Sequence, residues 1–144
     1  MTAAVVSALH VLGIAISFGA LFARQRALGQ RDLAATLYAD NFWGLSALLV
    51  IGTGLARAFA GLEKGTTFYL ENPVFHLKLG LLGLVLLLEL WPMLALVVLR
   101  VRQARGADAP PPRWPLFRGL SIAQFTLLLG MLFSASFMAR GIGM

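Results

Sequence analysis

Four ionisable side chains lie within long apolar stretches of this sequence: His10, Arg57, Lys78 and Glu89. A charged group inside a lipid bilayer costs about 2.5–3.5 kcal/mol on insertion scales, so each is expected to have a partner, a cavity or a function. A neutral imidazole can ligate a metal ion or a haem iron, and cationic side chains can bind an anionic ligand. These four residues are therefore the candidates for a site.

His10 is the deepest of the nitrogen-bearing side chains. If the membrane boundary lies near Thr2, His10 is about eight residues, or about 12 Å, further along a helix. Ser7, Gly13 and Ser17 share its helical face and would leave room for a flat cofactor or for a neighbouring helix. Hydrogen bonding of a buried imidazole to a serine or a backbone carbonyl is the structural alternative to ligation.

Arg57 and Lys78 each lie about one helical turn below the same membrane surface, at the ends of consecutive apolar stretches. Two interpretations remain open: the side chains reach independently for lipid headgroups, or they form a clamp around one anion. The loop carboxylates Glu63 and Glu71 are alternative partners for such a clamp. His76, at the interface, is expected to be solvated.

Glu89 follows Lys78 by 11 residues, which places it on the same helical face about 16 Å deeper. This distance excludes a direct ion pair between the two. Glu89 is therefore either protonated, paired with another helix, or part of a proton path. Pro92 is expected to kink the helix nearby, and Gln124 is expected to face the same interior.

The composition of the chain indicates that these residues lie in a membrane rather than in water. Of 144 residues, 59% are hydrophobic and 12% are charged, against roughly 45–50% and 25% in soluble domains. The sequence has no cysteine, which excludes disulfides, thiolate metal sites and cysteine nucleophiles. The net charge of +6 is distributed between apolar runs, so no nucleic acid is expected as a partner.

The apolar residues form four stretches, each near the roughly 20 residues that a helix needs to cross a membrane. We expect an all-α fold, an integral membrane four-helix transmembrane bundle in a single domain without internal repeats. The predicted spans are about 2–23, 41–60, 75–100 and 117–139.

The charges between these spans predict the topology. The connections 24–40 and 100–118 carry eight arginines, which places both on the cytoplasmic side. The connection 61–74 is nearly neutral and lies on the other side with both termini, so the chain is N-out and C-out. A short surface helix fits within it, and the proline-rich run 108–112 should break any helix. The arginines are Arg24, Arg26, Arg31, Arg100, Arg102, Arg105, Arg113 and Arg118.

Two short motifs resemble those of a known membrane enzyme family. The run ALHVL at 8–12 resembles the first helix of HemJ-type protoporphyrinogen oxidases, and FHLKL at 75–79 resembles their His-x-Lys-Leu motif. These enzymes belong to a wider CopD-like set of small four-helix membrane proteins. The run from 63 to 92 resembles a bacterial membrane family of unknown function, which implies a multi-pass protein of the bacterial cytoplasmic (inner) membrane.

The HemJ-like resemblance implies a haem b held by His10 as the metal ligand. Arg57 and Lys78 would offer charge-assisted hydrogen bonds to the porphyrin propionates. The resemblance also implies that Lys78 is needed for the oxidation of protoporphyrinogen, and we group Arg57 and Glu89 with it as candidate catalytic residues. Where HemJ-type proteins tend to carry a histidine at the far end of the third helix, this chain has ELWP at 89–92. This departure from the motif bears on the expected oxidase activity more than on the expected haem cofactor.

Two classes of function remain open at this point. One is a haem-binding membrane redox protein, an oxidoreductase of the HemJ type, with a porphyrin substrate. The other is a non-enzymatic small membrane protein, either an assembly partner or a handler of copper or other ions. Copper would require several Met or His ligands together, and only Met138 matches the depth of His10. The lipid bilayer is the expected partner in both classes, and a homo-oligomer is compatible with either.

Overall fold

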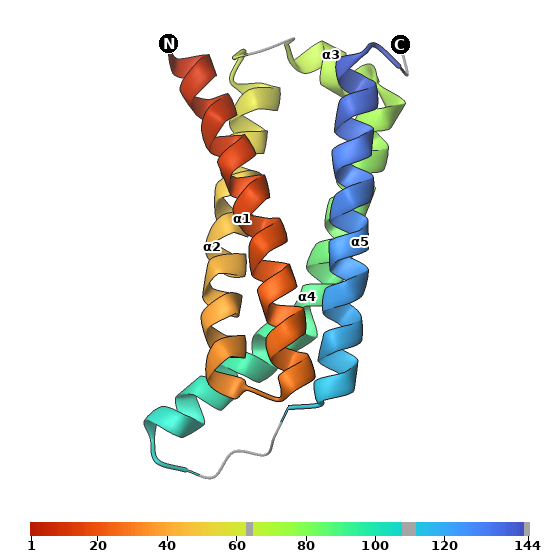
Figure 1. Ribbon diagram of the computed structural model, residues 1–144. Helices are drawn as coiled ribbons and strands as arrows, with labels where there is room; N and C mark the ends of the chain where they lie inside the picture. Colours follow the sequence, from red (N-terminus) through yellow and green to blue (C-terminus); the bar gives the residue numbers. More distant parts are fainter. Residues whose placement is uncertain (63–64, 108–111, 143–144) are drawn as a thin grey trace.

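The computed structural model describes residues 1–62, 65–107 and 112–142. Within these ranges the chain is helical and has no strand, which confirms the predicted all-α class. Four long helices run up and down the molecule, and one short helix crosses an end (Figure 1). They are α1 (Thr2–Gln30), α2 (Leu33–Phe59), α3 (Thr66–Glu71), α4 (Pro73–Ala104) and α5 (Trp114–Ala139).

The turn between α1 and α2 is much shorter than the predicted connection 24–40. Arg31 ends α1 in the left-handed region, with φ 56°. The carboxylate of Asp32 then caps α2 by accepting a hydrogen bond from the Ala35 N–H at 3.0 Å. The expectation that Arg24 lies in a loop is therefore wrong, because α1 continues past it to Gln30.

The start of α4 follows its predicted signals. The side chain of Asn72 accepts a hydrogen bond from the Val74 N–H at 2.8 Å, and Pro73 occupies the first helical turn. The preceding helix α3 confirms the expected short helix within 61–74. Glu63, Lys64 and residues 108–111 of the predicted proline-rich linker lie outside the described residues.

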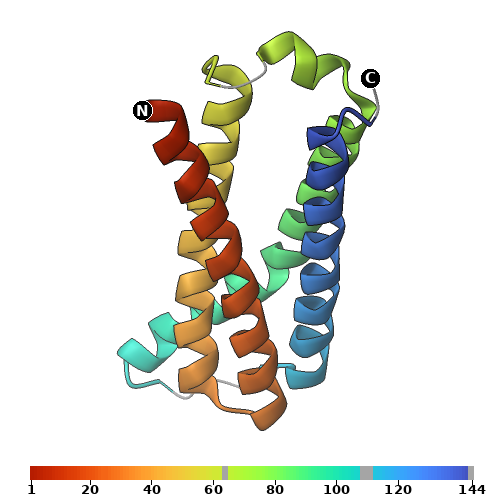
Figure 2. The ribbon, with the colours of Figure 1, turned by 45° about the horizontal axis from the view of Figure 1, so that its top comes forward.

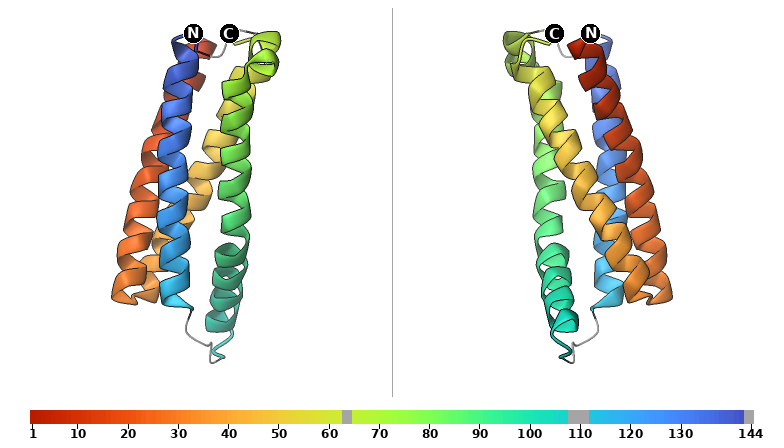
Figure 3. Two further views of the ribbon diagram at one scale, coloured as in Figure 1. Left: turned by 90° about the vertical axis from the view of Figure 1, so that its right-hand side faces the viewer. Right: turned by 90° about the vertical axis from the view of Figure 1, so that its left-hand side faces the viewer.

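The long helices form two antiparallel pairs, α1 with α2 and α4 with α5, which meet through α1 and α5. Both termini and α3 lie at one end of the bundle, which we call the α3 end (Figure 3). The α1–α2 turn and the segment that joins α4 to α5 lie at the opposite end. The two pairs separate toward the α3 end, as Figure 2 shows.

Helix α4 is bent in its second half, where Figure 1 shows it passing toward α2. Pro92 lies inside this helix. A proline has no N–H to donate and its ring crowds the carbonyl one turn earlier, which bends a helix. Beyond Pro92, Arg100 donates hydrogen bonds to Asn41 Oδ1 at 2.6 Å and to the Leu37 carbonyl at 3.0 Å. The last turns of α4 are thereby held against α2.

The outer surface of the bundle is apolar. Leu48, Leu87 and Phe133 are 72%, 66% and 60% exposed, an arrangement that suits hydrocarbon and not water. All four long helices are long and apolar enough to cross a membrane. The protein is therefore a multi-pass membrane protein.

Candidate functional site

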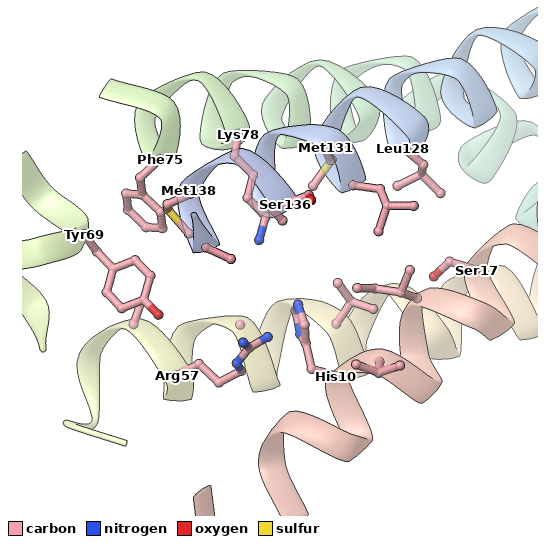
Figure 4. Close-up of a pocket in the computed structure, with 18 of the residues that line it drawn as sticks. His10, Ser17, Arg57, Tyr69, Phe75, Lys78, Leu128, Met131, Ser136 and Met138 are labelled. Atoms are coloured by element: carbon pink, nitrogen blue, oxygen red, sulfur yellow. The ribbon is translucent and has the colours of Figure 1, made fainter. Parts of the chain in front are cut away.

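A cavity of about 390 Å³ lies at the α3 end, between the α1–α2 pair and the α4–α5 pair (Figure 4). We call it the α3-end cavity. Its walls are mainly apolar and aromatic, and they come from all five helices. Representative wall residues are Val50, Phe68, Tyr69, Phe75, Leu128, Met131 and Met138.

His10 is 4% exposed and lines this cavity, which confirms that it faces the interior of the bundle. Its Nδ1 lies 2.8 Å from Thr53 Oγ1. The Thr53 hydroxyl also lies 2.5 Å from the Leu49 carbonyl, and a hydroxyl that donates to this carbonyl accepts from the imidazole at Nδ1. In that arrangement the neutral ring carries its proton on Nδ1 and has its lone pair on Nε2. This is the tautomer that an Nε2 ligand requires.

Two glycines allow α1 and α2 to pack closely around this histidine. A Cβ at Gly54 would lie 3.3 Å from His10 Cε1, and a Cβ at Gly13 would lie 2.8 Å from Val50 Cγ2. Ser17 donates to Ser46 Oγ at 2.9 Å across the same helix pair. The small residues near His10 therefore serve helix packing, one of the two roles predicted for them, while Ser17 also lines the cavity.

Arg57 and Lys78 line the same cavity from α2 and α4. Figure 4 shows the charged ends of both side chains directed toward the space that His10 faces. Glu71, one of the two alternative partners, is exposed and forms no salt bridge within the described part of the chain. The structure thus brings together three of the four candidate residues, and two of the three are cations.

Glu89, the fourth candidate, lies outside the lining of this cavity and binds Arg24. The Arg24 side chain is 1% exposed. Its Nη1 and Nη2 donate to the two carboxylate oxygens of Glu89 at 2.9 Å each, and Nη1 also donates to Asp40 Oδ1 at 3.0 Å. Of the three states predicted for Glu89, pairing with another helix is confirmed.

The remaining donors of Arg24 are also satisfied. Nε donates to Ser121 Oγ at 3.0 Å, and Nη2 donates to Gln124 Oε1 at 2.6 Å. Gln124 in turn donates from Nε2 to Glu89 Oε2 at 2.7 Å, which confirms that it faces the interior. Each of the five N–H bonds of a guanidinium therefore has an acceptor here.

Arg100 completes this group by donating to Asp40 Oδ2 at 2.9 Å. Two arginines then face two carboxylates, so the formal charges balance. We call this group the charge cluster, and it connects all four long helices. Its members are Arg24, Asp40, Glu89, Arg100, Ser121 and Gln124.

Sequence reasoning missed Arg24 and Asp40 as interior residues, because both were assigned to a loop. A signal was present: Arg24 follows Ser17 by seven residues, and seven residues return to nearly the same helical face. Arg24 therefore continues the interior face that carries His10 and Ser17. His76 is exposed, as predicted, and one ring nitrogen lies 2.8 Å from the Leu70 carbonyl.

Within residues 1–62, 65–107 and 112–142, no group of three or more His, Asp or Glu side chains is placed to hold a metal ion. The cavity that His10 lines instead combines one imidazole, two cations and apolar walls.

Comparisons with known proteins agree with the membrane assignment. No curated protein and no solved structure matches the chain. A family model described as a predicted membrane protein (DUF2214) matches residues 2–143, which confirms the expected membrane family of unknown function. The HemJ-like and CopD-like resemblance gains no support from this match and stays a prediction. The chain belongs to the DUF2214 family of membrane proteins.

Proposed function

We propose that this protein binds haem b in the α3-end cavity and acts as a membrane redox protein, with oxidation of a porphyrinogen as the candidate reaction. The observation that carries the proposal is the shared cavity of His10, Arg57 and Lys78. In the same proposal the protein lies in the bacterial cytoplasmic membrane, with the α3 end on the outer side.

The residues present fit this cofactor in three respects. His10 supplies an imidazole, and a hydrogen bond between its Nδ1 and Thr53 would orient the ring with Nε2 as the ligating nitrogen. Arg57 and Lys78 supply cations for the two propionates. The remaining wall is mainly apolar, and a volume of about 390 Å³ falls within the roughly 300–1,000 Å³ typical of ligand cavities.

Each residue then has a defined task. His10 would hold the iron, while Arg57 and Lys78 would bind and orient anionic carboxylates at the mouth of the cavity. The apolar side chains of α4 and α5 exclude water and so strengthen these charge-assisted contacts. When bound, haem supplies one-electron redox chemistry. Glu89 lies outside the cavity, so we assign it to the charge cluster that supports the bundle.

The absorption spectrum of the protein purified in mild detergent tests the proposal. We expect an intense Soret band for the wild type and its loss in His10→Ala. His76→Ala is the matched control, because it removes an imidazole that is exposed and does not line the cavity. A folded wild type from haem-sufficient cells without a Soret band would refute the proposal. So would a full haem complement in His10→Ala.

A copper site is a second candidate, since Met131 and Met138 line the same cavity as His10. Thioether and imidazole groups are suitable ligands for Cu(I). The two cations on this cavity disfavour it, because they would repel a bound metal ion. Metal analysis of the same preparation separates the candidates: stoichiometric copper without a Soret band would favour the copper site.

A further inference from the structure

A second hollow lies at the opposite end of the bundle, between the second half of α4 and the start of α5. This groove has a volume of about 720 Å³, and we call it the α4–α5 groove. Its walls are apolar except for two arginines. Residues used in the argument below are Leu90, Trp91, Leu94, Val98, Arg102 and Arg113.

The groove follows from the bend in α4. After Pro92 the helix passes toward α2, where Arg100 binds Asp40 Oδ2 at 2.9 Å and the Leu37 carbonyl at 3.0 Å. The first turn of α5 does not follow this path (Figure 2). The space between the two helices is therefore fixed by the fold.

The apolar wall of the groove faces the surroundings of the protein. Leu94 and Val98 are 60% and 52% exposed, and in a membrane-spanning helix such side chains face lipid. From Leu90 to Val98 the helix rises about 12 Å. This length is close to the roughly 15 Å of hydrocarbon in one leaflet, so the wall can accommodate most of one acyl chain.

The polar side chains that line the groove are cationic. Arg113 Cζ lies 5.5 Å from the centre of the Trp91 ring, a cation–π contact that orients its guanidinium at the groove. Arg102, in the last turn of α4, also lines the groove. Neither arginine forms a salt bridge among the residues that the structure describes. The groove thus combines an apolar channel with two cations in its lining.

We propose that the α4–α5 groove binds one anionic phospholipid. The phosphate binds Arg102 and Arg113, and an acyl chain lies along the apolar wall of α4 that includes Leu94 and Val98. Charge complementarity favours an anionic phospholipid over a zwitterionic one. Basic pockets between membrane helices attract anionic headgroups, which carry no positive group that the arginines would repel. A zwitterionic lipid carries its own cation, which would lie close to the two arginines. The proposal is independent of haem binding.

Native mass spectrometry of the full chain in detergent measures this binding directly. We would titrate phosphatidylglycerol and phosphatidylcholine with identical acyl chains. Wild type should bind phosphatidylglycerol more tightly. Removing one arginine in Arg102→Gln or Arg113→Gln should weaken that binding about fivefold. The double variant should lose the preference between the two lipids.

Two further variants separate a groove from general attraction to a basic surface. Arg105→Gln removes the same charge from the exposed turn after α4 but lies outside the groove, so phosphatidylglycerol binding should stay within about twofold. Val98→Trp fills the groove and keeps both arginines, so it should weaken binding as much as the loss of a charge. Equal binding of both lipids by the wild type would overturn the proposal. Equal effects of Arg105→Gln and Arg102→Gln would overturn it as well.

Discussion

The guanidinium of Arg24 binds the carboxylate of Glu89 through two parallel hydrogen bonds of 2.9 Å, and this pair joins α1 to α4 inside the bundle. Asp40 accepts a further hydrogen bond from the same guanidinium at 3.0 Å. In a membrane the alternative environment for each of these groups is hydrocarbon, so the contacts are expected to hold the helices in one register.

We first predict that Arg24→Met destabilises the folded protein by about 3–5 kcal/mol, because it leaves Glu89 and Asp40 buried with less cationic neutralisation. Arg26→Met is the control, since it removes an exposed arginine two residues away on the same helix. Thermal unfolding in detergent, followed by circular dichroism, measures the difference. Equal melting temperatures for Arg24→Met and wild type would contradict the prediction.

A second substitution tests whether the loss of stability in Arg24→Met comes from the broken ion pair between Arg24 and Glu89. Glu89→Met alone leaves Arg24 with Asp40 as its only carboxylate, whereas the double variant Arg24→Met and Glu89→Met removes both partners. Breaking a buried pair from one side costs more than replacing both partners by apolar groups. The double variant should therefore be more stable than Arg24→Met.

Our second prediction concerns the space beside His10. Gly54→Ala places a Cβ 3.3 Å from His10 Cε1, so the ring must shift by a few tenths of an ångström. Haem content should fall, and the Soret band of any remaining haem should move. Gly52→Ala is the control on the same helix, because nothing lies within 4 Å of the added methyl group. Unchanged spectra for both variants would argue against ligation by His10.

Third, Thr53→Val should weaken haem binding about 10–100-fold, the usual effect of removing the partner that orients a ligating histidine. Valine keeps the shape of threonine but cannot accept the hydrogen bond from Nδ1. Thr126→Val is the control, since that exposed threonine donates only to the Ile122 carbonyl within its own helix. Titration of the apoprotein with haem measures both affinities, and equal values for Thr53→Val and wild type would contradict the assigned tautomer.

The helices themselves were predictable because apolar runs of about 20 residues with few charges have few alternatives to a membrane span. His10 was also predictable as an interior residue, since an imidazole in hydrocarbon needs a partner. The charge cluster was not predictable in full. Arg24 and Asp40 flank a stretch that composition alone assigns to a loop, and only the tight turn at 31–32 shows that both lie in helices. The identity of the partner of Glu89 could therefore be learned only from the tertiary structure.

Our fourth prediction is the orientation in the membrane. The other seven arginines of the predicted cytoplasmic connections lie toward the end opposite α3, so that end should face the cytoplasm even though Arg24 is buried. The chain has no native cysteine, so single substitutions can be labelled without background. Glu71→Cys should react with a membrane-impermeant maleimide in intact cells, and Ala107→Cys should react only after the membrane is opened. The reverse pattern would invert the topology.

The last prediction concerns Arg57 and Lys78 as a clamp for the carboxylates of a porphyrin. Arg57→Met and Lys78→Met should each lower haem affinity by about tenfold or more, because each removes one charge-assisted hydrogen bond worth about 1.5–3 kcal/mol. Lys78→Met should also reduce porphyrinogen oxidation if Lys78 contacts the substrate. Haem titration and a turnover assay measure the two effects separately.

Arg140→Met is the matched control for this clamp. Arg140 follows α5 at the same end of the bundle, is exposed and does not line the cavity. Its loss changes the net charge by the same amount, so general attraction between a basic surface and an anionic porphyrin would weaken equally in all three variants. A clamp instead predicts normal binding in Arg140→Met and weak binding in the other two. If all three variants bind haem like the wild type, the clamp is refuted.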